Sequence, residues 1–219
     1  QAADMLRDAS LAMFRAKGAG RNRVEVFDDA LRARAMSRLR TEADLRLAAD
    51  RHQLILFYQP IVRLSDQSIA GFEALIRWHH PRRGFVSPAD FIPVAEETGL
   101  INEIGRWVLD TATRQALEWP DGIAVAVNVS PVQFRTGQLQ LKVVSALSHS
   151  GLDPQRLMIE ITEGVSLNDT DQPMAILGDL KLLGVKIAMD DFGTGYSSLS
   201  YIRKFRFDKI KIDQSFVRD

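Results

Sequence analysis

The sequence predicts an α/β protein whose mostly parallel sheet closes into a barrel, and two observations carry that prediction. From Gln53 onward, strand-like runs alternate with helical segments, an order that is typical of parallel sheets. Five of these runs are apolar on one face and carry polar groups on the other, mostly toward their carboxyl ends. An open doubly wound sheet is covered by helices on both faces, so its strands should be apolar on both. A barrel has one face against helices and one face inside, and it therefore fits the pattern.

Six strands are expected, at residues 54–62, 69–78, 123–130, 156–162, 185–190 and 207–213. A short link with the letters SDQS joins the first two, so that pair is expected to be antiparallel or irregular. Helices are expected between most of the others, and one should begin at Ser87-Pro88 with a serine cap and a proline in its first turn. Glycines that suit the residue after a helix follow three helical patterns, at Gly99, Gly151 and Gly184.

The first fifty residues have a different texture. Residues 1–27 are expected to form a short helix, a turn and a strand, because apolar residues at helical spacing precede the letters GAGRN and VEVF. Residues 28–52 are rich in arginine, alanine and leucine and predict a connecting helix. Its apolar stripe repeats every four residues, at Leu31, Ala35, Leu39, Ala43 and Leu47. Acidic residues are interspersed, so the basic ones predict a solvated face rather than a nucleic-acid patch.

Composition excludes several classes of function. The 219 residues carry a formal net charge of +0, so no overall field attracts nucleic acid or a membrane surface. Cysteine is absent, which excludes disulfides and thiolate metal sites and fits a reducing compartment. No apolar run approaches the ~20 residues that span a bilayer, and the N-terminal letters QAADMLRDAS lack the apolar core of a signal peptide. Because the chain has no initiator methionine, we expect an excised piece of a longer protein.

Polar residues recur on the inner face of the expected strands. Each of five strands contributes one of them, namely Glu73, Asn128, Glu160, Asp190 and Lys211. Active sites of such barrels lie at the carboxyl ends of the strands, so we expect these five side chains to meet at one mouth. Asp191 follows Asp190 directly, and neighbouring residues of a strand point to opposite faces. We therefore expect the chain to turn there, with Asp191 over the same rim.

Acids this close together cannot all ionise without compensation, and divalent cations are the simplest compensation. Oxygen ligands from aspartate, glutamate and asparagine favour Mg²⁺ or Mn²⁺ over zinc. Two adjacent aspartates suit two such ions, which together activate water and stabilise a leaving oxygen in phosphodiester hydrolysis. Lys211, on the inner face, is placed to hold that water or to neutralise charge that develops on phosphorus.

Simpler interpretations exist for each residue taken alone. A single strand acid is more often a surface or capping group than a ligand. Asn128 could cap the next helix, Lys211 and Asp213 could form an ordinary ion pair, and Glu163 could be exposed. The coincidence over five strands favours a site. The letters DFG also occur in protein kinases, but no HRD-type loop or glycine-rich phosphate loop precedes them. The pair His79-His80 has no further histidine or cysteine nearby, which favours loop packing over metal binding.

These motifs resemble a known family. EALIRW, residues 73–78, is similar to the hallmark of EAL domains, the cyclic di-GMP phosphodiesterases, and FYQPIV, NVS, IEITE, DDFGTGYSSL and KIKID follow in the family's order. The resemblance covers about Leu54 to Asp219. It implies a TIM-like (β/α)8 barrel with an antiparallel first strand, here truncated after the sixth strand. It further implies hydrolysis of cyclic di-GMP to linear 5′-pGpG with two Mg²⁺ or Mn²⁺ ions.

The resemblance also implies roles for individual residues. First-metal ligands would be Glu73, Asn128, Glu160 and Asp190, and Asp190 and Asp191 would serve the second metal. Catalytic roles would fall to Lys211, Asp191 and Glu163, the last by anchoring the DFGTGYSSL loop that couples dimerisation to metal binding. Substrate-binding positions would be Gln59, Leu75, Arg77 and Asp213.

The N-terminal letters DMLRDASLAMFRAKGAGRNRVEVF resemble the last helix and strand of a GGDEF domain, without its active-site motif. The expected organisation is a GGDEF remnant at 1–27, a connecting helix at 28–52 and a C-terminally incomplete EAL domain at 53–219. We expect a cytoplasmic homodimer with a GGDEF domain in the parent chain, which could itself be membrane-tethered, and no nucleic-acid polymer as partner. The alternatives to an enzyme are an inactive cyclic di-GMP receptor and a regulatory or dimerisation module.

Overall fold

The computed structural model describes residues 29–162, 172–193 and 205–217, together with residues 9, 10, 13, 17, 20 and 22. The chain divides into two compact units, Gln1–Leu47 and Ala48–Asp219. In the first unit, helix α2 spans Asp29–Leu45 and so ends before the predicted limit near residue 52. Residues 46–52 form turns instead, and His52 has a left-handed φ of 54°. Most of the predicted GGDEF-like remnant lies outside the described residues.

Two leucines of the stripe predicted for α2, Leu39 and Leu47, are exposed. A helix turns once every 3.6 residues, so a strict four-residue repeat winds around its axis and does not keep to one face. The spacing predicted the helix correctly but not a continuous buried side.

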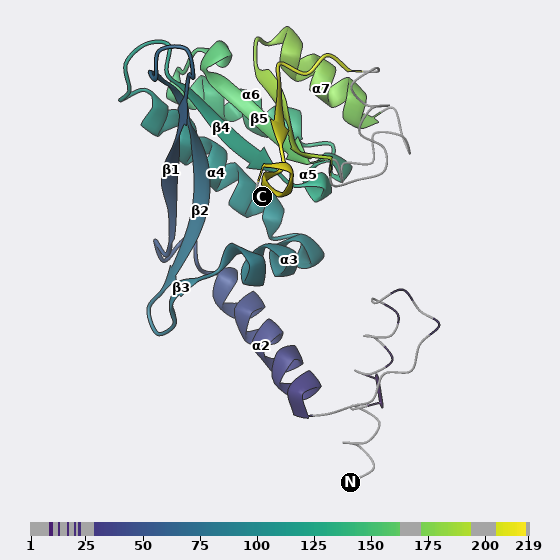
Figure 1. Ribbon diagram of the computed structural model, residues 1–219. Helices are drawn as coiled ribbons and strands as arrows, with labels where there is room; N and C mark the ends of the chain where they lie inside the picture. The colour runs from purple at the N-terminus through teal and green to yellow at the C-terminus, as the bar shows by residue number, and fades with distance from the viewer. Residues whose placement is uncertain are drawn as a thin grey trace. The chain divides into compact units, whose positions relative to one another are not determined.

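The described part of the second unit contains a seven-stranded mixed sheet (Figure 1). Its strands run in the order β1-β2-β4-β5-β6-β7, and β3 pairs with β2 off this path. Their bounds are β1 Leu54–Val62, β2 Ile69–His80, β3 Gly84–Val86, β4 Ala124–Val129, β5 Leu157–Thr162, β6 Lys186–Phe192 and β7 Lys209–Ile212. All six predicted strands are therefore present, and the short strand β3 is an addition that the sequence did not reveal.

The pair β1–β2 is antiparallel, and every later pair along the main path is parallel. The SDQS link folds back because Gln67 takes a φ of 57° and the backbone amide of Arg63 donates to the carbonyl of Ser68 at 2.8 Å. Asp66 accepts from the amide of Ser68 at 3.0 Å and completes the turn. The short link therefore produces the antiparallel pair that was predicted.

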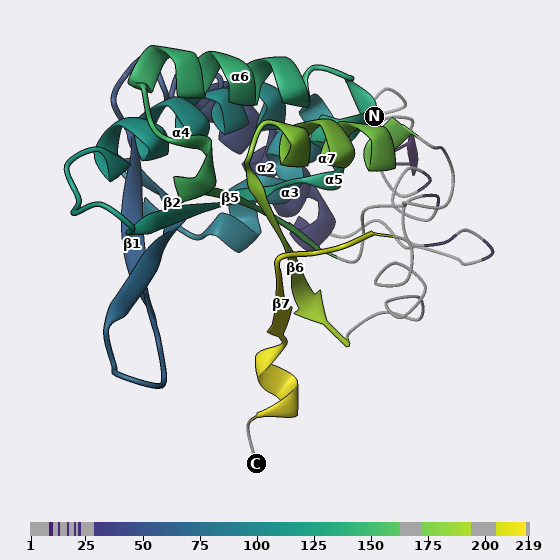
Figure 2. The same ribbon diagram turned by 90° about the horizontal axis from the view of Figure 1, so that it is seen from above.

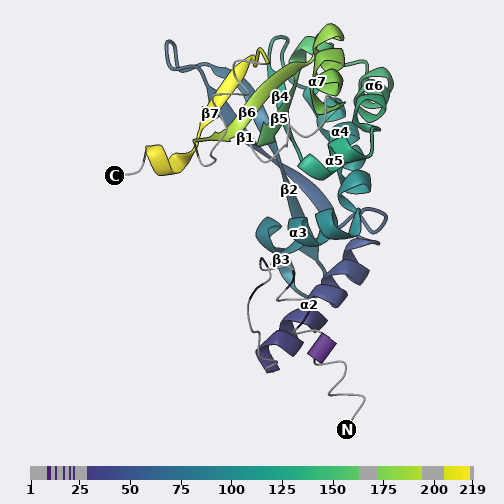
Figure 3. The same cartoon turned by 90° about the vertical axis from the view of Figure 1, so that its right-hand side faces the viewer.

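Helices cover the outer face of the sheet (Figures 2 and 3). They are α3 Pro88–Thr98, α4 Ile101–Ala116, α5 Pro131–Arg135, α6 Leu139–Ser150 and α7 Gln172–Leu182, with 3-10 turns η1 Pro154–Arg156 and η2 Gln214–Phe216. The strand residues beneath them are apolar and at most 1% exposed, as at Val125, Val127, Ile159, Ile161 and Ile187. This face carries the hydrophobic core of the unit.

The ends of the helices follow the sequence signals. Ser87 caps α3 by accepting from the amide of Ala89, and Pro88 is the first helical residue. Gly99, Gly151 and Gly184 all take left-handed φ values after their helices, as predicted.

The inner face of the sheet is polar at one end and small and apolar in the middle. Ala126, Met158 and Ala188 form a buried cluster there, and Ile61 packs against it. Gly71 lets β2 approach β4, since a Cβ at this position would lie 2.7 Å from the carbonyl oxygen of Ala124. The sheet, with its antiparallel first pair, its parallel later strands and helices over its outer face, corresponds to part of a TIM-like barrel. Among the described residues, no ladder joins β7 to β1.

No helix in the described part of the chain is both long and apolar enough to cross a membrane.

Candidate active site

Four parallel strands and β2 bring the predicted polar residues to one end of the sheet. The register pairs Asn128 with Glu160, and Thr162 with Asp190, so successive strands are staggered toward their carboxyl ends. The side chains of Glu73, Glu160 and Asp190 all contact the ammonium group of Lys211, which lies on β7. The convergence expected from alternating faces is therefore confirmed.

Lys211 lies at the centre of this group. Its Nζ donates to Glu73 Oε2 at 3.0 Å, to Glu160 Oε2 at 2.6 Å and to Asp190 Oδ2 at 2.9 Å. An ammonium group has three donors, so all of them are used here. Burial alone would lower the pKa of Lys211, but the hydrogen bonds that it donates to Glu160, Asp190 and Glu73 outweigh burial and raise that pKa overall. Lys211 is thus held in its charged form.

Glu160 is the most deeply placed acid of the group. It is 0% exposed, and its Oε1 has no hydrogen-bond partner among the described residues. Burial raises the pKa of Glu160, the bond and charge of Lys211 lower it, and the charges of Glu73 and Asp190 raise it again, with a net increase. A buried carboxylate oxygen without a partner is costly, so this atom is suited to receive a ligand.

The three carboxylates form a set that could hold a metal ion. One oxygen each from Glu73, Glu160 and Asp190 lie within 4.8 Å of one another. Asn128 adds an amide that donates from Nδ2 to Glu73 Oε1 at 2.7 Å. All these donors are oxygens or amides, the chemistry of a hard divalent cation. The ammonium of Lys211 fills the same space with a positive charge, which indicates that the pocket between the oxygens is built around a cation.

The adjacent acids Asp190 and Asp191 are accommodated by a break in the strand. The β6–β7 register shifts between Met189 and Phe192, and Asp191 has a left-handed φ of 54°. Its amide donates to Asp190 Oδ1 at 2.9 Å. Burial, then the charges of Asp190 and Asp213, raise the pKa of Asp191. The chain thus turns at this point, as predicted, and Asp191 remains close enough for the charges of the other acids to raise its pKa.

Three predicted substrate-binding residues, Gln59, Leu75 and Arg77, lie on strands β1 and β2. Gln59 lies opposite Glu73 in the β1–β2 ladder, and Leu75 is the next residue of β2 on the same face. Arg77 lies further along and its guanidinium packs over Phe57, with the carbon Cζ 5.4 Å from the ring centroid.

Asp213 caps η2, where its side chain accepts from the amide of Ser215 at 2.8 Å. Hydrogen bonds from the side chain and then from the amide of Ser215 lower the pKa of Asp213. Glu163 and most of the DDFGTGYSSL loop lie outside the described residues. His80 is buried and its Nδ1 accepts from the amides of Arg82 and Arg83 at 3.2 Å, which agrees with loop packing.

A supporting network behind Asn128 was missed at the sequence level. Ser130 donates from Oγ to Glu96 at 2.6 Å, and its amide donates to Gln133 Oε1 at 3.0 Å. The serine and glutamine form a capping box at the start of α5. The spacing S-P-V-Q at residues 130–133 indicates such a cap, but only the tertiary structure brings Glu96 of α3 to it. The end of β4 is thereby fixed from two helices.

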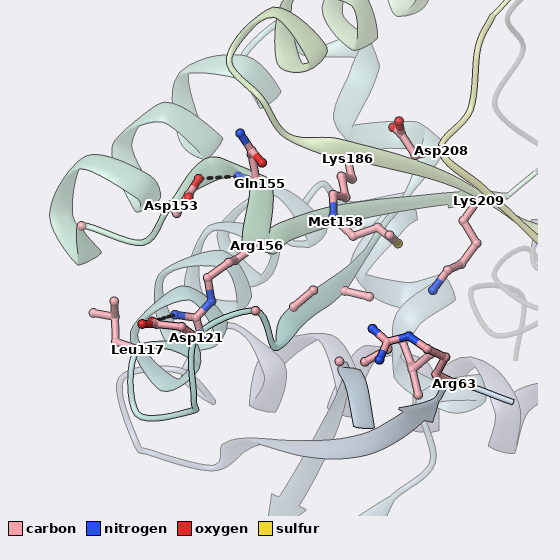
Figure 4. Close-up of a pocket in the computed structure, with 17 residues that line it drawn as sticks. Arg63, Leu117, Asp121, Asp153, Gln155, Arg156, Met158, Lys186, Asp208 and Lys209 are labelled. Carbon is pink, nitrogen blue, oxygen red and sulfur yellow. Dashed lines mark hydrogen bonds and ion pairs between the residues drawn. The ribbon is translucent and has the colours of Figure 1, made fainter. Parts of the chain in front are cut away.

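A cavity of about 870 Å³ lies at the other end of the same strands (Figure 4). The first residues of β4, β6 and β7 line it, namely Ala124, Lys186 and Lys209. None of the three converging carboxylates belongs to its walls. In barrels of this kind chemistry occurs at the carboxyl ends of the strands, so the acids, rather than this cavity, are the candidate active site.

Comparison with known proteins agrees with this geometry. Residues 42–219 match the sequence profile of the EAL domain. The chain belongs to the EAL domain family. This EAL chain is 47% identical over 216 residues to an uncharacterized protein, y4lL, of Sinorhizobium fredii, covering 99% of the chain and 26% of that protein. It is 42% identical over 220 residues to MucR of Pseudomonas aeruginosa, named a bifunctional diguanylate cyclase/cyclic di-GMP phosphodiesterase, covering 99% of the chain and 32% of MucR. The EAL chain thus spans about a quarter to a third of these curated relatives.

Two solved structures extend the comparison. The MucR phosphodiesterase in complex with c-di-GMP has a TM-score of 0.77 at 44% identity, over 81% of the EAL chain and 74% of the MucR chain. The EAL enzyme Bd1971, bound to cAMP and cyclic di-GMP, has a TM-score of 0.78 at 28% identity, over 99% of the EAL chain and 58% of that chain. The fold is therefore that of an EAL domain.

Proposed function

We propose that the protein hydrolyses cyclic di-GMP to linear 5′-pGpG. The observation that carries the proposal is the convergence of Glu73, Glu160 and Asp190 on Lys211 at the carboxyl ends of the strands. The names of relatives support the substrate, since MucR and NbdA of Pseudomonas aeruginosa are both named cyclic di-GMP phosphodiesterases. The solved complex of MucR with c-di-GMP supports it as well.

We propose two divalent cations, Mg²⁺ or Mn²⁺, as cofactors. Glu73, Asn128, Glu160 and Asp190 would hold one ion, and Asp190 with Asp191 would hold the other. The unpartnered Oε1 of buried Glu160 and the all-oxygen carboxylate set support this assignment. When bound, such a pair activates a water molecule and stabilises the leaving oxygen of a phosphodiester.

The chain's own residues position the reacting groups. In the reaction, water adds to one phosphorus and the 3′ oxygen leaves with a proton, which opens the ring to a 5′-phosphate and a 3′-hydroxyl. Lys211, kept charged by its three carboxylates, places a positive charge where negative charge develops on phosphorus. Asp191 lies at the rim beside Asp190, where a carboxylate can accept the proton of the attacking water.

The alternative is a receptor that binds cyclic di-GMP without cutting it. Retention of all the described ligand positions and of Lys211 supports catalysis, because a receptor has no need of a charged lysine among carboxylates. Incubation of the protein with cyclic di-GMP and Mn²⁺, followed by chromatography of the nucleotides, separates the two functions. We expect 5′-pGpG from the wild type and none from Asp190→Asn or Lys211→Ala.

Matched controls are available on the same elements. Lys209→Ala removes a lysine from the same face of β7, and Asp179→Asn removes an exposed acid from α7. Both should retain activity. Intact cyclic di-GMP that remains bound to folded wild-type protein would contradict the hydrolase proposal and establish a receptor.

Further proposals concern the assembly, the parent chain and the location of the protein. We propose a homodimer, a GGDEF domain in the parent chain, and a cytoplasmic location that is supported by the absence of cysteine. The division at residues 27 and 52 is likewise proposed. Light scattering tests the dimer, and the Glu163 anchor is tested by the effect of Glu163→Ala on metal affinity in that dimer.

A further inference from the structure

The residue before β7 holds that strand to β6 through its side chain as well as its backbone. Asp208 Oδ2 accepts from the amide of Ile187 at 2.8 Å, and the amide of Asp208 donates to the carbonyl of Ile187 at 2.8 Å. In a regular parallel ladder a backbone carbonyl of the neighbouring strand accepts from such an amide. The carboxylate of Asp208 takes the place of that carbonyl, so one residue satisfies both backbone groups of Ile187.

Helix α7 reinforces this contact. Lys181 Nζ donates to Asp208 Oδ1 at 3.0 Å and to the carbonyl of Arg206 at 2.6 Å. It also lies 5.7 Å from the centroid of the Phe205 ring. The segment that enters β7 is therefore fixed to α7 as well as to β6. The β7 anchor is defined here as Asp208, Ile187 and Lys181.

The β7 anchor sets the position of Lys211. The ladder between β6 and β7 shifts its register beyond Met189, and Lys211 has no partner among its register pairs. Asp208 stands three residues before Lys211, and Ile187 stands three residues before Asp190. Bonds between the first members of these two pairs bring the second members side by side, where Lys211 Nζ lies 2.9 Å from Asp190 Oδ2.

We propose that Asp208 is a positioning residue of the reaction, which holds Lys211 among the carboxylates. The effect on turnover rests on the proposed function, because Lys211 is given its catalytic role there. Three residues of a strand span about 10 Å, so Asp208 does not touch a phosphate at the acids. Figure 4 shows it with Lys186 and Lys209, the first residues of β6 and β7, at the cavity end of the strands. Asp208 therefore acts through the backbone of β7.

Loss of the carboxylate of Asp208 should displace Lys211. Ile187 is 0% exposed, and a buried amide without a partner is costly, so β7 is expected to shift when the carboxylate is removed. The three hydrogen bonds of Lys211 are 2.6 to 3.0 Å long. A displacement of about 1 Å takes them beyond hydrogen-bonding distance and is enough to slow a reaction about 100-fold.

Asp208→Ala tests the position of Lys211 by two measurements. With cyclic di-GMP and Mn²⁺, kcat should fall about 10- to 100-fold, the range for loss of a partner behind a metal-site residue. KM should change less than about threefold, because the predicted substrate-binding positions on β1 and β2 are untouched. In metal-free protein, the ¹⁵N NMR signal of the Lys211 ammonium group, identified by its absence from Lys211→Met, should be lost. Ammonium protons without their acceptors exchange with water too fast to be observed.

Matched variants separate this role from a general loss of stability. Asp208→Asn keeps an oxygen for the amide of Ile187 and loses only the charge toward Lys181. It should therefore retain the ammonium signal and a kcat within about fivefold of the wild type. Asp153→Ala removes another carboxylate at this end of the sheet, which accepts from the amide of Gln155 at 2.9 Å. It should lower the unfolding midpoint without an effect on kcat or on the ammonium signal.

Three results would overturn the proposal. They are a wild-type kcat with an unchanged ammonium signal in Asp208→Ala, an equal loss of both in Asp153→Ala, and an equal loss of both in Asp208→Asn. If Asp208→Ala does not fold, Lys181→Met takes its place, because that pair is partly exposed and its loss frees Arg206 as well. Its kcat should fall about two- to fivefold, and an unchanged kcat and signal would overturn the proposal.

Failure of the proposed function is recognised separately. The wild type would then leave cyclic di-GMP intact, whereas the ammonium signal of metal-free Asp208→Ala would still decide whether Asp208 holds Lys211 among the carboxylates.

Discussion

Replacement of Lys211 by methionine tests whether the active site is held together by a cation. The ammonium group is bonded to three carboxylates, of which Glu160 is 0% exposed and Glu73 and Asp190 are 16% and 17% exposed. Methionine keeps the length of the side chain and removes its charge. Glu160 would then be a buried acid without a counter-ion in metal-free protein.

The magnitude follows from that burial. Removal of one partner of a buried ion pair costs about 3–5 kcal/mol, because the other charge is left uncompensated. We expect the lower end, about 3 kcal/mol, since two of the carboxylates are partly hydrated and Glu160 can take up a proton. With a urea m-value of about 2 kcal/mol/M, the unfolding midpoint should fall by roughly 1.5 M.

The assay is urea unfolding in EDTA and again with Mn²⁺. A divalent ion that binds the same oxygens replaces the missing positive charge, and ion at 100 times its dissociation constant adds about 2.7 kcal/mol. Mn²⁺ should therefore stabilise Lys211→Met more than the wild type, in which the ammonium must first be displaced. Lys186→Met is the control, because Lys186 is exposed at the opposite end of β6.

Two results would refute this reasoning. One is a free energy of unfolding of Lys211→Met in EDTA that differs from the wild type by less than about 0.5 kcal/mol, the usual range for surface substitutions. The other is an equal fall in the Lys186→Met control. Either would mean that the three contacts to Lys211 do not hold the acids together.

Further predictions concern stability. Gly71→Ala should lower the free energy of unfolding by about 1–3 kcal/mol because its Cβ meets Ala124, whereas Gly178→Ala, a helical position with open space, should raise it by roughly 0.5–1 kcal/mol; thermal unfolding of the pair checks both signs. Ser87→Ala should cost about 1 kcal/mol through loss of the α3 cap, and an unchanged melting temperature would contradict the cap. Burial raises the pKa of Glu160 above the ordinary 4.5. In EDTA the protonated form of Glu160 therefore stabilises the fold, and this contribution is lost as pH rises through the raised pKa. The unfolding midpoint of Glu160→Gln, which cannot titrate at this position, should not show this fall with rising pH.

The strands, and the acids that meet at one end of the sheet, could be predicted because apolar and polar residues alternate along each strand with a period of two. Each inner position, such as Glu160 between Met158 and Thr162, follows from alternation, and the register of β4 and β5 then places Asn128 beside it. The alternation within each strand needs no tertiary information, whereas the register between strands does. The antiparallel first pair followed from the shortness of its link.

Two contacts between distant elements, outside the pattern of alternating strand faces, could not be predicted. Nothing local to Glu96 shows that α3 delivers it to Ser130, and strand β3 is only three residues long, too short for an alternating pattern. Phe85 on β3 therefore gave no sign that it returns to Phe57. The sequence predicted a turn at Asp191 but not its left-handed backbone. Aspartate tolerates that conformation, but its presence does not indicate it.

The break at Asp191 explains how two adjacent acids avoid lying on opposite faces of one regular strand. On a regular strand Asp191 would enter the helix-packed face, where Met189 is 1% exposed and an unpaired carboxylate would be costly. The register shift between Met189 and Phe192 releases it from that face, and the bond from its amide to Asp190 fixes the turn. The same apolar packing that defines the outer face thus drives the second acid toward the mouth. The position of the acid pair is therefore a consequence of the two faces of the sheet.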